Sequence, residues 1–142
     1  MKTVFISKDD IDATLSKPPV KGKNLLEPFQ SFAVENKLPF SILEDTAVEN
    51  DAEVHKTDGD LWFCLEGEAT FVCGGKLIEP YHRVLRSGAE NPDELYGPGI
   101  SDGEKFILKP GDWLWIPPGE AHQHGATGTT RLIIIKISAQ SR

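Results

Sequence analysis

From Phe40 onward, apolar and polar residues alternate in short runs that are bounded by Gly, Pro, Asn and Asp. Alternation with a period of two places every second side chain on the same face of a strand, so each run predicts a β-strand. Six such runs stand out in the sequence: residues 40–49, 61–67, 69–75, 105–111, 112–119 and 131–137. Many short strands separated by turn residues predict an all-β sandwich or barrel.

The residues before this region lack the alternation and contain one predicted helix. Ser7 stands where a residue caps the first turn of a helix, and Asp10 follows three positions later, where the partner in a capping box lies. A pair of prolines at 18–19 then ends the helix, because proline lacks the amide proton that a helix interior requires. We therefore expect an N-terminal extension with a short helix, residues 1–39, packed on a β-barrel formed by residues 40–142.

Two of the predicted strands are separated only by Gly67 and Glu68, and a glycine at the first turn position is typical of a tight β-hairpin. A hairpin here predicts that the two strands lie side by side. Pairing outward from the turn gives three predicted pairs: Leu65 with Thr70, Cys64 with Phe71, and Trp62 with Cys73.

The first strand of this predicted hairpin is apolar on both faces. An antiparallel strand normally leaves one face to water, so something must cover the second face. Another sheet of the same chain or a second subunit would serve, and we expect a homodimer. One face carries Asp60, Trp62 and Cys64, and the face expected at the dimer interface carries Leu61, Phe63 and Leu65 or their neighbours in the sheet.

Composition narrows the class of protein. A chain of 142 residues is long enough for one hydrophobic core, and we expect a single domain. Its 22 acidic and 15 basic residues give a net charge of −7, which argues against nucleic acids and anionic membranes as partners. No apolar run is long enough for a signal peptide or a membrane span, so we expect a cytoplasmic protein. The two cysteines, Cys64 and Cys73, are expected to be buried thiols.

The sharpest chemical signal lies in residues 111–122. Gly111, Pro117, Gly119 and His122 follow the pattern G-x5-P-x-G-x2-H. This pattern resembles the second motif of the cupin superfamily, with all four fixed positions in register. The resemblance implies that the first cupin motif, H-x-H-x(3,4)-E-x6-G, lies upstream.

The expected spacing of that first motif is present with altered chemistry. Glu53, His55, Asp60 and Gly67 match it, but Glu53 stands where the family most often has His, and Asp60 where it has Glu. The resemblance covers residues 40–138. It implies the cupin-type double-stranded β-helix, a jelly-roll barrel whose closure removes exposed strand edges.

The motif residues predict a metal site. Glu53 and His55 are two positions apart on a strand, so both side chains leave the same face, and Asp60 begins the next strand after a turn. The family resemblance places His122 beside them from across the barrel. Two imidazoles with one or two carboxylates suit a divalent iron, zinc, manganese or nickel ion and leave coordination positions open for a substrate.

These residues also have simpler interpretations. A single histidine in a strand is commonly a core or surface residue, and Asp58 and Asp60 in the sequence TDGD fit a turn. Asp60 is one methylene shorter than glutamate, so it reaches an ion only where its backbone lies closer. We expect His55, Asp60 and His122 to bind the ion, and Glu53 to be a weak, displaceable ligand or a partner that orients a bound water.

Further residues are candidates for the substrate site. His124 lies two positions after His122 and faces the same way, so it is a fourth ligand, a general acid or base, or a polar residue at the rim. Trp62 and Phe71 line one wall of a pocket, or belong to the core. The Gly- and Pro-rich segment 81–104 is predicted to be a long, functional or mobile loop. Its groups best placed to meet a substrate anion are Tyr81, His82, Arg83 and Arg86.

Two functional hypotheses follow from the resemblance. The cupin fold hosts dioxygenases, isomerases, lyases and non-catalytic sensors, so the fold alone does not choose among them. The first hypothesis is a metal-dependent enzyme that acts on a small polar or acidic molecule, with His124 as a catalytic proton carrier. The first motif is similar to that of 3-hydroxyanthranilate dioxygenases, although the carboxylate here comes one residue sooner. The second hypothesis is a non-catalytic module that binds or senses a small ligand.

Overall fold

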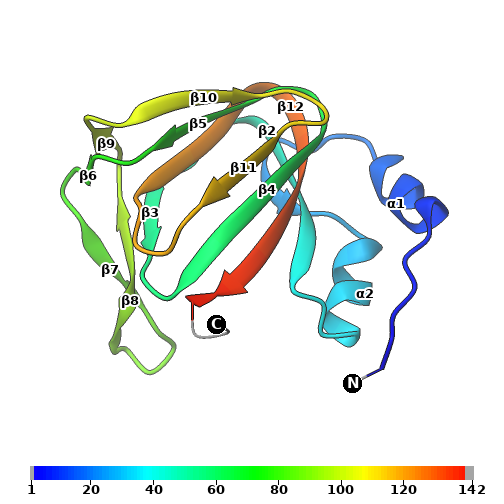
Figure 1. Ribbon diagram of the computed structural model, residues 1–142, viewed down its shortest axis with the longest axis horizontal. Helices are drawn as coiled ribbons and strands as arrows, with labels where there is room; N and C mark the ends of the chain where they lie inside the picture. Colours follow the sequence, from blue (N-terminus) through cyan, green and yellow to red (C-terminus); the bar gives the residue numbers. More distant parts are fainter. Residues whose placement is uncertain (1, 140–142) are drawn as a thin grey trace.

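A computed structural model of the chain describes residues 2–139 (Figure 1). Most of them lie in β-strands, as the alternating pattern predicted. In chain order the elements are α1 (Lys8–Leu15), β1 (Gly22–Leu25), α2 (Phe29–Glu35), β2 (Phe40–Glu49), β3 (Ala52–His55), β4 (Asp58–Glu66), β5 (Ala69–Cys73), β6 (Lys76–Leu77), β7 (Tyr81–Val84), β8 (Glu90–Gly97), β9 (Ile100–Ser101), β10 (Glu104–Leu108), β11 (Trp113–Ile116) and β12 (His122–Ser138).

The long strand β12 joins two layers of one continuous sheet. Its first residues pair with β5 and β3, and from Arg131 onward it pairs with β4. It pairs with β2 on both sides of a register shift between Ala126 and Thr129. One layer therefore has the order β11-β4-β12-β2-β1, and the other has the order β10-β5-β12-β3-β8-β7. All of these pairings are antiparallel, and together they make the jelly-roll barrel that the sequence predicted.

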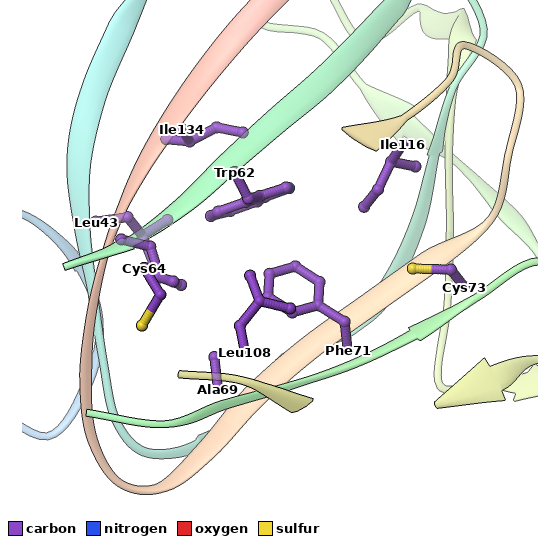
Figure 2. Packing of buried hydrophobic residues seen from close by; sticks show 10 residues of the cluster. Leu43, Trp62, Cys64, Ala69, Phe71, Cys73, Leu108, Ile116 and Ile134 are labelled. Carbon is purple, nitrogen blue, oxygen red and sulfur yellow. The ribbon is translucent and has the colours of Figure 1, made fainter. Parts of the chain in front are cut away.

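The hydrophobic core lies between the two layers (Figure 2). Trp62 and Cys64 of β4 and Phe71 and Cys73 of β5 all point into it, which confirms the inward face predicted for these strands. The rings of Trp62 and Phe71 meet edge to face with centroids 5.1 Å apart. Both cysteines are free and buried, as expected.

The predicted hairpin between β4 and β5 is wrong. These strands do not pair with each other, because β4 lies between β11 and β12, whereas β5 lies between β10 and β12. The turn at Gly67 carries the chain from one layer to the other, so the inward side chains of the two strands face each other across the core. Gly67 has a φ of 73°, and a Cβ there would lie 2.0 Å from the carbonyl oxygen of Thr129. Only glycine fits this close approach to the bend of β12.

The segment 81–104 is also not a long loop. It forms the antiparallel pair β7–β8 and the short strand β9, with a turn in which the amide of Leu85 donates to the carbonyl of Ala89 at 2.8 Å. Strand β7 is the outer edge of its layer, where polar side chains are normal. Its residues therefore lack the apolar alternation on which strand prediction relies.

The N-terminal residues pack against the outside of the β2-β12-β4 layer. Helix α1 has the predicted capping box, in which Ser7 and Asp10 exchange two hydrogen bonds of 3.0 and 3.1 Å. Strand β1 and helix α2 were not predicted. Phe29 of α2 centres a second apolar cluster that includes Leu65 and Ile133 of the barrel. Part of the second apolar face of β4 is thus covered by the same chain. The division of the chain at residue 40 into an extension and a barrel stays a prediction.

A buried ion pair fixes this extension to the barrel. Arg131 of β12 binds Glu44 of β2 through Nε at 2.9 Å and through Nη2 at 2.8 Å. The same guanidinium donates to two backbone carbonyl oxygens, that of Leu15 at the end of helix α1 and that of Lys17 just after it. Glu44 in turn accepts a hydrogen bond from the amide of Val20 at 3.0 Å. The connection between α1 and β1 is therefore held by one arginine and one glutamate.

The remaining outer face of the β11-β4 pair stays apolar and open. Trp113 and Trp115 of β11 are 58% and 45% exposed, and they pair with Phe63 and Leu61 of β4. The rings of Phe63 and Trp113 lie 4.4 Å apart. Within residues 2–139, neither helix has the length and apolar character that crossing a membrane requires.

Candidate metal centre

Three predicted ligand residues meet inside the barrel. Glu53 and His55 come from β3, and His122 comes from the start of β12, where it is the ladder partner of Glu53. Glu53 Oε1 lies 3.6 Å from Nε2 of His55 and 3.6 Å from Nε2 of His122. The three ligand atoms lie within 4.8 Å of one another. This arrangement is compact enough to surround a single metal ion.

Asp60 approaches the same two nitrogens from β4. Its Oδ2 atom lies 3.6 Å from Nε2 of His55 and 3.3 Å from Nε2 of His122. Both Asp60 Oδ2 and His122 Nε2 are buried and have no hydrogen-bond partner of acceptable geometry among the described residues. A buried polar atom without a partner is costly. One divalent ion between these atoms would satisfy both, so the residues present fit a metal.

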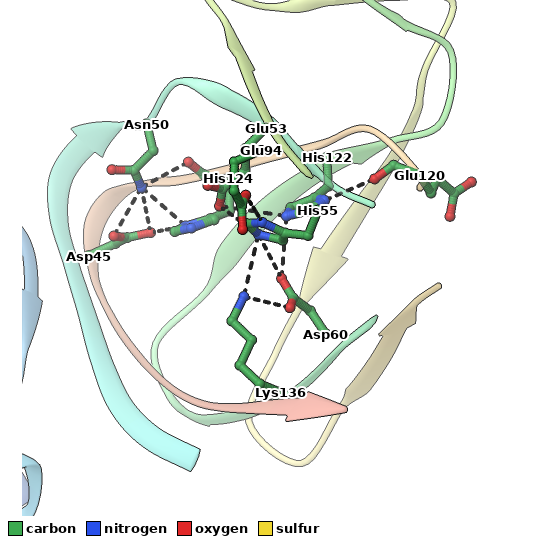
Figure 3. Close-up of polar contacts among 10 residues, drawn as sticks. All are labelled: Asp45, Asn50, Glu53, His55, Asp60, Glu94, Glu120, His122, His124 and Lys136. Atoms are coloured by element: carbon green, nitrogen blue, oxygen red, sulfur yellow. Dashed lines mark hydrogen bonds and ion pairs between the residues drawn. The ribbon is translucent and has the colours of Figure 1, made fainter. Parts of the chain in front are cut away.

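The two histidines are held in the orientation that metal binding requires (Figure 3). Nδ1 of His55 donates to the carboxylate of Glu94, and Nδ1 of His122 donates to the carbonyl oxygen of Glu120 at 3.1 Å. Both acceptors lack a proton, so each neutral imidazole keeps its proton on Nδ1 and turns the lone pair of Nε2 toward the site. Such outer partners are typical of metal-binding histidines.

Glu94 was missed by the sequence analysis. It lies on β8, directly opposite His55 of β3, in the segment that was predicted to be a loop. The pairing of β3 with β8 is what brings it to the site, and no motif spacing connects it to His55. Glu94 could have been identified only if residues 90–97 had been predicted as a strand that pairs with β3.

The charges of the site shift the pKa values of its members. Burial acts to lower the pKa of His122, but its contacts with Asp60 and Glu53 raise it to about 9. Burial likewise opposes the charged form of His55, and the Glu53 carboxylate nevertheless raises its pKa. Burial acts to raise the pKa values of Glu53 and Asp60, yet the histidines, and Lys136 beside Asp60, hold both below their usual range. A metal ion therefore competes with protons for these imidazoles.

Lys136 is a second residue that the sequence analysis missed. It lies in the last predicted strand and is the ladder partner of Asp60 across β12 and β4. Its Nζ atom lies 2.6 Å from Asp60 Oδ1 and 3.4 Å from His55 Nε2 (Figure 3). The site therefore contains an ammonium group of its own, next to the atoms that are expected to bind the ion.

His124 is buried in the barrel near these residues. Its Nδ1 atom lies 2.6 Å from Oδ2 of Asp45, and Asn50 donates to Oδ1 of the same carboxylate at 3.1 Å. Its ring packs on Trp62, with centroids 4.9 Å apart. Figure 3 shows His124 between Asp45 and the metal-site side chains. Asp45 and Asn50 were not candidates in the sequence, because they lie outside both motifs.

A cavity of about 750 Å³ opens beside the centre. Its walls include two of the residues predicted for the substrate pocket, Trp62 and Arg83. The other three lie elsewhere. Phe71 is fully buried in the core behind Trp62, the Tyr81 hydroxyl donates to Asp51 at 3.3 Å, and Arg86 is exposed outside the lining of the cavity. Phe71 therefore follows the core alternative. The assignment of Tyr81 and Arg86 assumed a loop folding over the barrel, whereas β7, β8 and the turn between them hold these two residues at the edge of the sheet.

Searches with the sequence against protein-family models and against curated proteins found no match. The fold, in contrast, resembles several solved structures. A cupin protein from Bacteroides fragilis matches with a TM-score of 0.50 and 19% identity, over 89% of this chain and 86% of that chain. A CENP-C domain from Drosophila melanogaster matches with a TM-score of 0.51 and 12% identity, over 94% and 85%. An oxalate oxidase matches with a TM-score of 0.50 and 17% identity, over 88% of this chain and 57% of that one. At these identities the likeness shows the fold alone.

Proposed function

We propose that this chain, a cupin by its fold, is a metal-dependent enzyme that acts on a small molecule in the cavity beside Glu53, His55 and His122. These three residues would hold a divalent ion, and Asp60 would be the fourth ligand. The observation that carries the proposal is a pair of buried atoms, Asp60 Oδ2 and His122 Nε2, which lie 3.3 Å apart and have no hydrogen-bond partner among the described residues. Iron, zinc, manganese and nickel all accept this ligand set.

A bound ion would supply a Lewis acid or an oxygen-activating centre, which fits reactions of the dioxygenase, isomerase or lyase type. The chain itself would supply positioning and proton transfer. Glu94 and the carbonyl of Glu120 keep His55 and His122 oriented. Because each of these imidazoles is anchored through Nδ1, neither needs to reorganise when an ion binds.

His124 supports an enzyme over a module that only binds a ligand. It lines the cavity, and its Nδ1 atom is fixed by Asp45, so Nε2 is left to accept or donate a proton. Asp45 is itself held by Asn50. A carboxylate that orients an imidazole in this manner is the arrangement used by enzymes that need a histidine base. A protein that merely captures a ligand has no need of such a base.

The proposal is tested by metal analysis of protein purified without chelator. Wild-type protein is expected to contain close to one equivalent of a divalent metal, and His55→Ala and His122→Ala are each expected to lose it. His82→Ala is the matched control, because His82 lies on β7 with its Nδ1 atom 3.2 Å from the carbonyl oxygen of Asn91. Full occupancy in both site variants would show that the ligand assignment is wrong.

A further inference from the structure

Lys136 lies next to the proposed metal centre, and the packing of the barrel does not by itself require a lysine there. Asp60, its ion-pair partner, is 1% exposed, whereas the side chain of Lys136 is 47% exposed and lines the cavity. Asp60 presents Oδ2 to the histidines and Oδ1 to the ammonium group. When Asp60 binds an ion through Oδ2, Lys136 can keep its contact with Oδ1. The remaining protons of the ammonium group then face the cavity beside the ion.

The charges around the cavity favour an anionic ligand once a metal is bound. Three basic and two acidic side chains line the cavity, and the buried carboxylates of Asp60 and Asp45 lie directly behind the lining histidines, so with neutral histidines the charges nearly cancel. A divalent ion makes the total positive. The lining charges are Lys23, Arg83 and Lys136 against Glu53 and Glu94. Two carboxylate ligands alone would neutralise the ion, and Lys136 restores a positive charge where the ligand binds.

Apolar side chains form one part of the cavity wall, next to the polar residues Ser41, Tyr96 and the two histidines. These apolar residues come from β1, β2, β4, β12 and the segment before β2, and they face the same space as Lys136. An apolar wall binds the hydrocarbon part of a ligand, whereas a fully polar ligand would leave this surface in contact with water. The apolar lining consists of Leu25, Leu38, Pro39, Phe40, Leu43, Trp62 and Ile134.

We infer that Lys136 binds the carboxylate of a small organic acid whose apolar body, aromatic or aliphatic, rests on this wall. The inference rests on the proposed metal site and names the class of molecule that the site accepts. One carboxylate oxygen of the ligand faces the ion, and the other accepts a hydrogen bond from Lys136. A charge-assisted hydrogen bond of this kind is strong in a partly buried site. Lys136 is thus a specificity-determining residue.

Binding of three probes to zinc-loaded protein tests the inference by calorimetry. Benzoate carries both a carboxylate and an apolar body, benzamide lacks the charge, and acetate lacks the body. We expect benzoate to bind at least about tenfold more tightly than either of the others, since one charge-assisted contact or one buried ring is enough for such a factor. Benzamide that binds as tightly as benzoate, or benzoate that does not bind at all, would overturn the assignment.

Substitutions at Lys136 assign the effect to one residue. Lys136→Met keeps the aliphatic stem and is expected to weaken benzoate at least about tenfold while leaving benzamide unchanged. Lys136→Arg should restore benzoate binding. Lys105→Met is the charge-matched control on the exposed strand β10 and is expected to behave like wild type. Equal benzoate affinity in Lys136→Met and wild type would remove Lys136 from the ligand site.

The zinc content of each sample separates this inference from the proposed function. If wild-type protein takes up no zinc, the proposed metal site is wrong. The Lys136 assignment is then still decided by benzoate binding to the metal-free variants. If wild-type protein binds zinc but Lys136→Met does not change benzoate affinity, the metal site stands and the assignment of Lys136 is wrong.

Discussion

Replacing Arg131 by methionine should destabilise the barrel and release the N-terminal extension first. Arg131 is 4% exposed, and its partner Glu44 is fully buried. Methionine retains much of the aliphatic volume but removes the charge and every hydrogen bond of the guanidinium. The carboxylate of Glu44 is then left inside the protein without a counter-charge, and the carbonyl oxygens of Leu15 and Lys17 lose their donors.

The size of the effect follows from this burial. Removing one member of a buried ion pair costs about 3–5 kcal/mol, because the other charge stays desolvated and unpaired. We expect a loss of about 4 kcal/mol in the free energy of unfolding, a large share of the 5–15 kcal/mol that is typical of a domain. In a chain of this size the loss corresponds to a fall of roughly 10–15 °C in Tm.

Two companion variants separate charge from packing. Arg131→Met combined with Glu44→Leu removes both charges and should recover most of the lost stability, since no unpaired charge remains. Lys8→Met removes the exposed pair of Lys8 and Asp12 on helix α1, in which the lysine side chain is 86% exposed. This control should change the free energy of unfolding by less than about 1 kcal/mol.

Urea denaturation followed by tryptophan fluorescence measures the free energy, and limited proteolysis locates the first opening. In Arg131→Met we expect early cleavage between α1 and β1, while the barrel strands stay protected. A stability within about 1 kcal/mol of wild type would refute the reasoning, because it would mean that Glu44 finds another partner or is neutral. Early cleavage in β12 instead would show that Arg131 supports the barrel itself and not the extension.

Two further predictions concern the metal ligands and the open sheet face. In competition with a chelator, Asp60→Asn should weaken metal affinity more than Glu53→Gln. The first variant removes a buried carboxylate ligand and also leaves the Lys136 ammonium group without its counter-charge beside the ion. The reverse order would make Glu53 the principal carboxylate ligand. The protein should be a dimer in light scattering, with an interface that includes Leu61, Phe63, Trp113 and Trp115, and Trp113→Asp should give a monomer. A monomeric wild type at micromolar concentration would contradict that interface.

Period-two alternation was sufficient to predict the strands that line the core. In β4 and β5 the inward side chains were identified correctly, because a strand with one buried face carries a strong repeating signal. The motif spacing also predicted that His122 lies beside Glu53 and His55, although it is far from them in the chain. Local pattern and family spacing are both properties of the sequence itself, so these features could be predicted.

Pairing partners could not be predicted in the same manner. The turn at Gly67 looks the same whether it closes a hairpin or carries the chain to the other layer, and the choice depends on β12, which comes much later in the chain. Lys136 was missed for the same reason. Its alternation with Ile135 and Ile137 places it on a defined face, but only the register of β12 against β4 shows that Asp60 is opposite.

The central position of β12 has a consequence for how the protein is made. This strand is the last one among the described residues, yet it pairs with β2, β3, β4 and β5 and carries His122, His124, Arg131 and Lys136. During synthesis the earlier strands leave the ribosome without the partner that joins them, so the barrel closes only after β12 itself has been made. Such long-range pairing makes folding slow and leaves apolar strands open to wrong partners meanwhile. A nascent chain halted before residue 122 would present those strands to chaperones.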